Sequence, residues 1–251
     1  MKRDKEPKQY SWLTTKIYSF MLLFYKNTFV VDYFIKKIDK SKDILEIGSG
    51  TGKDFKTLSK EYKITGSDYS EAFLKSLKKK FRKHQFLKIN AVNMAVGKQF
   101  DVIYSNKVLQ HLTPDQLEKS LSAQYEILKK GGVLFHAIWK GNPQNGKFDG
   151  IPDVLYQRED IEKIKGHFVI EEYIEYKEIK DNDSFIIILR KWSDRRKFTS
   201  MYIFYILVGM SDTTPNYYRY IRWLKKIPHP KTGQVIGYIV LNEVAVLVKS
   251  M

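Results

Sequence analysis

The sequence predicts an α/β protein in which helices cover both faces of a mostly parallel, seven-stranded sheet that ends in an antiparallel hairpin. Up to about residue 140, short apolar runs alternate with helical segments of about 10–15 residues, a pattern typical of parallel sheets. Two later strand-like runs, 168–179 and 184–192, are separated only by an Asp-Asn-Asp turn, which favours a hairpin. The chain has 251 residues, 43% of them hydrophobic, so it can bury one substantial core.

The strands expected before the hairpin are short and apolar, and a helical segment follows most of them. These strands fall at 44–47, 63–67, 86–90, 100–105 and 131–139. The first expected helix runs from a glycine-dense turn to Glu61, and the later ones span about 70–83, 113–130 and 156–165.

The helix expected at 113–130 carries its own boundary signals. Thr113 is a good N-cap residue, Pro114 suits the first helical position, and Gln116 completes a capping box with Thr113. The glycine pair that begins at Gly131 is expected to end this helix, because glycine is favoured just past a helix C-terminus.

The segments on either side of the sheet are expected to be additions to it. Residues 10–38 predict aromatic-rich helices with a break near Lys26. Beyond the hairpin, 195–209 and 217–226 are expected to be helices, and 236–248 a strand. The expected organisation is an N-terminal helical cap (1–39), a central domain (40–192) and a C-terminal helical and strand extension (193–251) that packs on the same domain.

The composition excludes several kinds of site. The chain has no cysteine, which excludes disulfides, zinc thiolate sites, thiol nucleophiles and the cysteine chemistry of 5-methylcytosine formation. No apolar run approaches the roughly 18–20 residues of a membrane-spanning helix. Residues 1–12 lack the features of an export signal. A cytoplasmic protein is therefore expected, and peripheral association with a membrane stays open.

The chain is strongly basic, with 44 Lys or Arg against 28 Asp or Glu and a formal net charge of +16. Residues 75–84, KSLKKKFRKH, concentrate this charge; such a run is most often a solvated helix face, but it also suits RNA. Basic and aromatic residues are mixed in 195–226, which suits a lid over a substrate, a homodimer surface or an anionic membrane surface. RNA, an anionic membrane and a second copy of the chain are therefore candidate partners.

A candidate ligand site follows the first expected strand. Gly48, Gly50 and Gly52 allow a sharp turn and close approach of a ligand, and the next helix offers unpaired N–H groups at its N-terminus. Glu46 precedes the first glycine by two residues. Asp68 ends the next strand, 18 residues after Gly50, about where an acidic residue accepts hydrogen bonds from ribose hydroxyls. The pattern predicts a nucleoside-binding site.

The glycines are spaced as G-x-G-x-G after an acidic residue, rather than as the G-x-G-x-x-G of dinucleotide sites. In this the sequence resembles the class I S-adenosylmethionine-dependent methyltransferases. The resemblance rests on ILEIGSGTG, Asp68, FDVIYSNKVLQHL (100–112) and EILKKGGVLFHAIW (126–139), and it covers residues 40–140 closely and 150–192 loosely. It implies a Rossmann-like three-layer sandwich and S-adenosylmethionine as the methyl donor. The aspartate set of metal-dependent catechol methylation is missing, so no metal is expected.

The resemblance also implies which residues hold the donor. The glycine loop contacts the methionyl part and the ribose, Glu46 orients the amino group, Asp68 holds the ribose diol and Tyr69 packs on the adenine. Asn90 stands where many members have an acidic residue, and its amide oxygen can accept the same hydrogen bond from the adenine amine. The implied donor-binding residues are Glu46, Gly48, Ser49, Gly50, Gly52, Asp68, Tyr69, Asn90, Ala91 and Ser105.

The acceptor side is expected just past the fourth strand. Oxygen and nitrogen acceptors must lose a proton, and histidine has a suitable pKa, so His111 is the candidate general base. A purely structural role for His111 stays open, as does a helix-capping role for Asp68. The expected walls of the acceptor pocket are Tyr104, Asn106, His136 and Trp139.

The expected reaction is methyl transfer to an oxygen or nitrogen of a small-molecule, sugar or lipid-like acceptor. RNA-directed methylation is an alternative, supported by the basic charge. The residues after the fourth strand do not form the [D/N/S]-P-P-[Y/F] motif that marks methylation of base amino groups. A non-catalytic protein that binds S-adenosylmethionine to regulate or scaffold a partner is the third interpretation.

Overall fold

The computed structural model describes residues 28–141, 145–148, 151–191, 224–228 and 235–240. The chain divides into two compact units, residues 1–193 and 194–251. The described part of the second unit is an antiparallel pair formed by β10 (Leu224–Pro228) and β11 (Val235–Val240). The predicted packing of the extension on the central domain stays a prediction.

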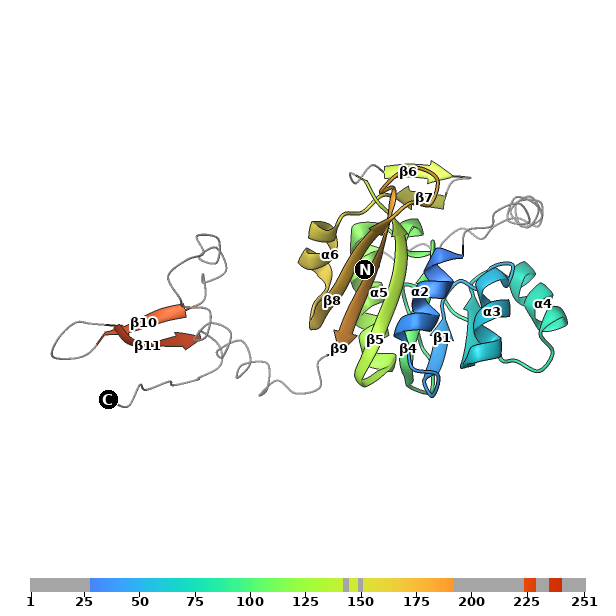
Figure 1. Cartoon of the computed structure of the whole chain (residues 1–251), viewed down its shortest axis with the longest axis horizontal. Coiled ribbons are helices and arrows are strands. Elements are labelled where there is room, and N and C mark those ends of the chain that lie inside the picture. Colours follow the sequence, from blue (N-terminus) through green and yellow to red (C-terminus); the bar gives the residue numbers. More distant parts are fainter. Residues whose placement is uncertain (1–27, 142–144, 149–150, 192–223, 229–234, 241–251) are drawn as a thin grey trace, which may run out of the picture. The chain divides into compact units, whose positions relative to one another are not determined.

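The first unit is built on a seven-stranded sheet with the order β3-β2-β1-β4-β5-β9-β8 (Figure 1). The strands from β3 to β5 are parallel, and β9 is antiparallel to both of its neighbours. This arrangement confirms the predicted mostly parallel sheet with a C-terminal hairpin. The strand bounds are Asp43–Glu46 (β1), Lys63–Asp68 (β2), Phe86–Lys88 (β3), Phe100–Asn106 (β4), Leu128–Trp139 (β5), Phe168–Tyr176 (β8) and Ser184–Lys191 (β9).

Helices cover both faces of the sheet and complete three layers. One face packs against α2 (Phe29–Lys37), α3 (Lys53–Glu61) and α4 (Glu71–Lys80). The other face packs against the short 3₁₀ helix η1 (Leu109–His111), α5 (Pro114–Ile127) and α6 (Arg158–Ile164). None of the helices in the described residues is long and apolar enough to cross a membrane.

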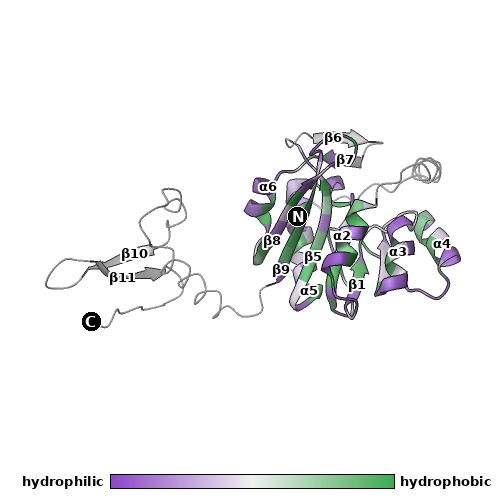
Figure 2. Ribbon diagram, viewed as in Figure 1, coloured by the Kyte–Doolittle hydropathy of each residue, from purple (hydrophilic) through white to green (hydrophobic). Residues whose placement is uncertain are grey.

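The sequence of each central strand explains why both faces of the sheet are covered. Side chains alternate between the two faces along a strand, so Val102 and Tyr104 pack on one side while Ile103 packs on the other. Because both sides are apolar, the central strands contain nearly continuous hydrophobic runs, and Figure 2 shows much of β5 and β9 as hydrophobic. Because β1, β2, β4 and β5 are parallel, their carboxyl ends meet at one edge of the sheet.

The α5 helix begins as predicted but ends earlier. The Thr113 hydroxyl accepts a hydrogen bond from the Gln116 N–H (3.4 Å), and the Gln116 side chain accepts one from the Thr113 N–H (3.0 Å), which forms the capping box. The helix ends at Ile127, because Leu128 is fully buried and pairs with Phe100 in the sheet. Gly131, with φ 72°, lies within β5, so the predicted glycine stop is wrong.

Three further regions differ from the sequence prediction or lie outside the described residues. The predicted helix at 217–226 is wrong for residues 224–226, which form β10, since their backbone pairs with the apolar strand β11. The predicted strand at 236–248 is confirmed up to Val240. The hairpin of β6 (Asn145–Phe148) and β7 (Ile151–Val154) was not predicted. The predicted helices before residue 28 and at 195–209 lie outside the described residues.

Candidate functional site

The loop between β1 and α3 requires glycine at each of its three glycine positions. Gly48, Gly50 and Gly52 all adopt left-handed conformations, with φ values of 69°, 51° and 79°. A Cβ atom on Gly48 would lie 2.5 Å from a methyl group of Val108, and one on Gly52 would lie 2.7 Å from the Phe81 ring. The loop therefore turns tightly against its surroundings and presents its backbone at the carboxyl edge of the sheet.

Asp68, at the end of β2, ties the glycine loop to the start of α4. One of its carboxylate oxygens accepts a hydrogen bond from the Gly50 N–H (2.9 Å) and the other from the Ser70 N–H (2.8 Å). Burial raises the pKa of Asp68, while hydrogen bonds from the backbone of Ser70, Gly50 and Tyr69 oppose this rise. The side chain that caps α4 is Ser70, not Asp68. Each carboxylate oxygen keeps lone pairs with which it can accept further hydrogen bonds from a ligand.

Glu46 is buried beneath the same loop and is held there by two serines. The Ser49 hydroxyl donates to its carboxylate (2.6 Å), and the Ser67 hydroxyl donates to its backbone carbonyl (2.7 Å). Burial raises the pKa of Glu46 to about 8, and the nearby carboxylates of Asp54 and Asp68 add to the rise. Three acidic side chains thus surround one loop. A cationic ligand would be stabilised there, because its charge favours the ionised form of Glu46 that burial opposes, and a phosphate would be repelled.

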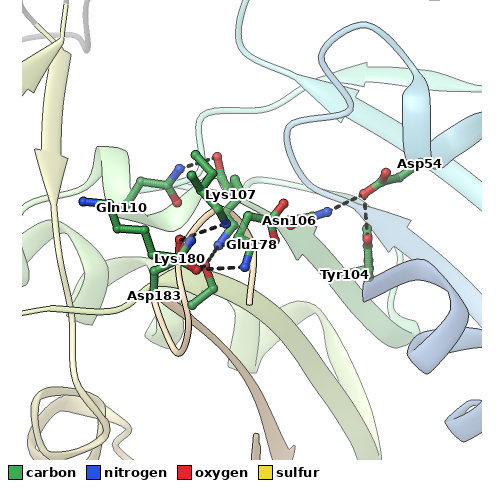
Figure 3. A network of polar contacts seen from close by, with 10 residues as sticks. Asp54, Tyr104, Asn106, Lys107, Gln110, Glu178, Lys180 and Asp183 are labelled. Atoms are coloured by element: carbon green, nitrogen blue, oxygen red, sulfur yellow. Dashed lines mark hydrogen bonds and ion pairs between the residues drawn. The ribbon is translucent and has the colours of Figure 1, made fainter. Parts of the chain in front are cut away.

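Asp54 is a site residue that the sequence prediction missed. It lies in the first turn of α3, directly after the glycine motif, and accepts hydrogen bonds from the Tyr104 hydroxyl (2.7 Å) and the Asn106 amide (2.9 Å; Figure 3). The available signal was its place at a helix N-terminus, where a carboxylate is favourable. Its partners, on β4, are about 50 residues away in the sequence and meet it because β1 and β4 are neighbours.

Two residues predicted to line the acceptor pocket lie inside the protein instead. Tyr104 is fully buried, its ring packed on Phe34 and Phe135, and burial followed by the charge of Asp54 raises its pKa well above the ordinary value. His136 is 1% exposed, and its Nδ1 lies 2.8 Å from the buried Ser105 hydroxyl. Both residues lie in the middle stretches of central strands, where the neighbouring layers enclose the side chains.

The protonation state of His136 follows from its burial. Burial lowers the pKa of His136 to about 3, so the imidazole is neutral near pH 7 and does not act as a base there. The Ser105 side chain is thus engaged with His136, and Ser105 is fully buried, so the structure does not present its hydroxyl to a ligand.

The residues predicted to hold the adenine follow β2 and β3. The Ile89 N–H bonds to the Asp68 carbonyl (3.1 Å), which keeps the segment after β3 beside Asp68. The Asn90 side-chain oxygen accepts a hydrogen bond from the Val92 N–H (2.9 Å) and so closes its own turn. Ala91 packs partly buried against the core, and Tyr69 is half-buried next to Asp68.

Lys107, directly after β4, is the second residue that the sequence prediction missed. Its backbone has a φ of 57°, and its Nζ donates to the Ser184 hydroxyl (2.6 Å). The ammonium lies 3.9 Å from the centre of the Trp139 ring and 3.9 Å from a Glu178 carboxylate oxygen. Burial lowers the pKa of Lys107 to about 8, against the opposing charges of Glu178 and Asp183. The Trp139 ring therefore packs against the Lys107 ammonium, and Figure 3 shows Glu178 and Asp183 beside Lys107.

His111, the candidate base, lies on η1 just beyond Lys107. Its backbone N–H bonds to the Val108 carbonyl (3.1 Å), and its side chain is half-buried. The loop below it is held firmly, since the Gln110 amide donates to the Lys107 carbonyl (2.7 Å) and Gln110 is 2% exposed. The structure thus places Asn106, Lys107 and His111 after β4, on the same edge of the sheet as the glycine loop.

Comparisons with known proteins agree with this geometry. Residues 45–134 match a family model described as a methyltransferase domain. No curated protein sequence matches the chain significantly. One similar solved structure is an S-adenosylmethionine-dependent methyltransferase from Clostridium acetobutylicum ATCC 824, with 19% identity and a TM-score of 0.58, covering 70% of this chain and 97% of that one.

Two further solved structures contain the donor or its demethylated product. The N-methyltransferase NodS from Bradyrhizobium japonicum WM9, in complex with S-adenosyl-L-homocysteine, has 17% identity and a TM-score of 0.51, covering 60% of this chain and 79% of that one. The glycopeptide N-methyltransferase MtfA, complexed with S-adenosylmethionine, has 11% identity and a TM-score of 0.54, covering 64% and 91%. At these identities the likeness shows the fold.

Proposed function

We propose that the chain methylates a nitrogen or oxygen of a small-molecule acceptor, sugars and lipid-like molecules included. The match of residues 45–134 to a methyltransferase-domain model and the shared fold support this proposal. S-adenosylmethionine supplies the methyl group when bound. The residues of the glycine loop fit this donor, since the three left-handed glycines leave room for a ligand against the backbone.

The observation that carries the donor assignment is the acidic character of the loop. Glu46, Asp54 and Asp68 lie close enough for the charges of the latter two to raise the pKa of Glu46. A sulfonium and an ammonium group would be attracted to these carboxylates. A pyrophosphate would be repelled, because like charges about 6 Å apart cost about 3 kcal/mol at an effective dielectric constant of 20.

Different residues of the site bind different parts of the donor. Asp68, already fixed by the Gly50 and Ser70 N–H groups, accepts hydrogen bonds from the ribose hydroxyls. Asp54 attracts the positive charge of the donor's methionyl part, and Glu46, which is mostly protonated near pH 7 because its pKa is about 8, ionises as that charge binds beside it. Asn90, Ala91 and Tyr69 lie beside the adenine, where an amide oxygen of Asn90 has a second lone pair for the adenine amine.

On the acceptor side, Asn106 and Trp139 flank the position where an acceptor would bind. His111 accepts the proton that an amine or hydroxyl acceptor loses, and its side chain is half-buried rather than enclosed. Two of the similar structures are named N-methyltransferases, which supports nitrogen as the acceptor atom.

The test is a screen with a donor whose methyl group carries deuterium, over metabolite, lipid and RNA pools, read by mass spectrometry of the products. With the acceptor in hand, His111→Ala should lower the single-turnover rate by about 10²–10⁴. His167→Ala, at an exposed turn before β8, is the matched control and should leave the rate unchanged. Equal rates for all three proteins would show that His111 only packs. Donor binding without any labelled product in any pool would favour a regulatory or scaffold role.

A further inference from the structure

The positive charge of residues 28–191 is concentrated on one surface, formed by residues 71–88. This segment carries seven Lys or Arg and a single Glu. The rest of residues 28–191 carries 22 Lys or Arg and 22 Asp or Glu, so it is balanced. An ordinary solvated surface mixes positive and negative side chains. Here the whole excess of positive charge lies on α4, the turn after it and β3, and this segregation requires an explanation.

The basic side chains of this surface are free to meet a partner. Lys75, Lys78 and Lys79 lie at i, i+3 and i+4 on α4, which places them on one helix face, and all three are exposed. Within the described part of the chain, none of the three is paired with a carboxylate. Arg82 and Lys83 are exposed in the following turn. We name Lys75, Lys78, Lys79, Arg82 and Lys83 the α4 basic surface.

The neighbouring helix extends the same charge. The Phe55 ring of α3 packs 5.0 Å from the Phe81 ring at the end of α4, which sets the two helices side by side (Figure 1). Lys56 and Lys60 are exposed on α3. The Lys80 ammonium donates to the Thr51 carbonyl of the glycine loop (3.0 Å), so the α4 basic surface borders the donor site.

The α4 basic surface has neither an exposed apolar face nor exposed aromatic rings, and this narrows the kind of partner it can bind. A membrane-binding helix inserts an apolar face, but the apolar face of α4, with Phe73, Leu74 and Leu77, is buried in the core. Single-stranded nucleic acids stack on exposed aromatic rings, but Phe81 and Phe86 here pack against Phe55. What is left is a row of cations without apolar or stacking groups, which suits the regular phosphates of a double helix.

We propose that the α4 basic surface binds the phosphate backbone of a double-helical nucleic acid beside the donor loop. Each lysine or arginine that neutralises a phosphate releases condensed counterions, so binding weakens steeply with salt. With five contacts, the logarithm of the binding constant falls by about 4.5 for each tenfold rise in salt. The binding is independent of base sequence, because these contacts reach only phosphates.

The test compares two triple variants of the full chain that have the same net charge. Lys75→Glu, Lys78→Glu and Lys79→Glu remove the centre of the α4 basic surface. Lys119→Glu, Lys130→Glu and Lys163→Glu change exposed lysines on α5, β5 and α6, three elements that together hold six acidic and five basic residues. Fluorescein-labelled duplexes of RNA and of DNA are titrated by anisotropy between about 50 and 200 mM salt.

The α4 variant should bind duplexes at least tenfold more weakly than the control variant and lose about three units of salt slope. Binding of either duplex through this surface supports the proposal, and the preferred duplex identifies the source of the phosphates. Equal affinity of the two variants would overturn it. Retention of the wild type on phosphatidylserine vesicles or on single-stranded poly(U), with weaker duplex binding, would also overturn it. Calorimetry with S-adenosyl-L-homocysteine shows that each variant is folded and separates this result from the proposed function.

Discussion

At the scale of single residues, the site combines acidic groups around the glycine loop with one enclosed ammonium after β4. Glu46 is buried beneath the loop next to Asp54 and Asp68, and Lys107 is enclosed by Trp139, Glu178 and Ser184. Both residues have pKa values displaced towards about 8, from opposite directions, and burial is the largest cause for each. Their titrations are therefore direct tests of the described geometry.

Glu46 predicts a pH dependence of stability. Its native pKa of about 8 lies above the ordinary 4.5, so the native state holds a proton that the unfolded state releases between these values. The free energy of unfolding should therefore fall as the pH rises through this window, by a few kcal/mol at about 1.4 kcal/mol per pKa unit.

Urea denaturation of the wild type and of Glu46→Gln from pH 5 to pH 8 measures this loss as the difference between the two profiles, because the opposite contribution of His136, which is neutral in the native state, is common to both. The stability of the wild type should fall relative to that of Glu46→Gln as the pH rises, whereas Glu159→Gln on the exposed first turn of α6 should follow the wild-type profile. Parallel profiles for the wild type and Glu46→Gln would show that Glu46 is not buried as described.

Lys107 predicts an unusually reactive amine. Burial lowers its pKa to about 8, whereas Lys63, bonded to Asp43, has a pKa raised above the ordinary value. Competitive acetylation between about pH 7 and 11, read by peptide mass spectrometry, should give a midpoint near pH 8 for Lys107 and a clearly higher one for Lys63. If both lysines titrate together, the Lys107 ammonium is not enclosed by the hairpin.

The sequence predicted some site residues better than others for a physical reason. The glycines and Asp68 are set by local spacing, since a tight turn and a strand end are short-range features. Asp54 and Lys107 act through partners that only the sheet order brings near them: Tyr104 for Asp54, and Trp139 with Ser184 for Lys107. Tyr104 and His136 are buried instead of lining the expected pocket, and their burial depends on how all three layers of the fold pack together.

At the scale of elements, α5 offers a clean test of a local signal. The Thr113 side chain accepts a hydrogen bond from the Gln116 N–H and so satisfies a group that has no partner within the helix. Thr113→Ala should lower the free energy of unfolding by about 0.5–2 kcal/mol in urea. Thr57→Ala, at an exposed position within α3, should change it by less than about 0.5 kcal/mol. Equal small changes would show that the cap contributes nothing.

The type of an element, helix or strand, was predictable where the segment is long and its hydrophobic pattern is regular. The boundaries of an element were not predictable where pairing with a distant strand competes with the local pattern. Residues 128–130 were expected to be helical but belong to the strand β5, because Leu128 is buried beside Phe100. The β6–β7 hairpin has no clear alternation in its short strands, and residues 224–226 pair with β11 despite their helical pattern. In each case a contact with a distant strand decided the outcome.

At the scale of the whole molecule, an acidic donor loop lies in a strongly basic chain. The net charge of +16 is the sum over the whole chain, whereas the side chains next to the loop, Glu46, Asp54 and Asp68, are acidic. The topology joins the glycine loop to Asn106 and His111, because β1 lies between β2 and β4 in the sheet. The mostly parallel sheet was predictable from the alternation of strands and helices. The acceptor was not, since no motif in the sequence indicates what the residues after β4 contact.

The most direct test of the account is calorimetric titration of the purified chain with S-adenosyl-L-homocysteine, beside NADH as a dinucleotide. The account predicts saturable binding of the first and none of the second. Asp68→Ala should weaken that binding by about 1–3 kcal/mol, since hydrogen bonds to the ribose are lost. Binding of NADH without any heat from S-adenosyl-L-homocysteine or S-adenosylmethionine would contradict the account, and unchanged affinity in Asp68→Ala would remove that residue from the site.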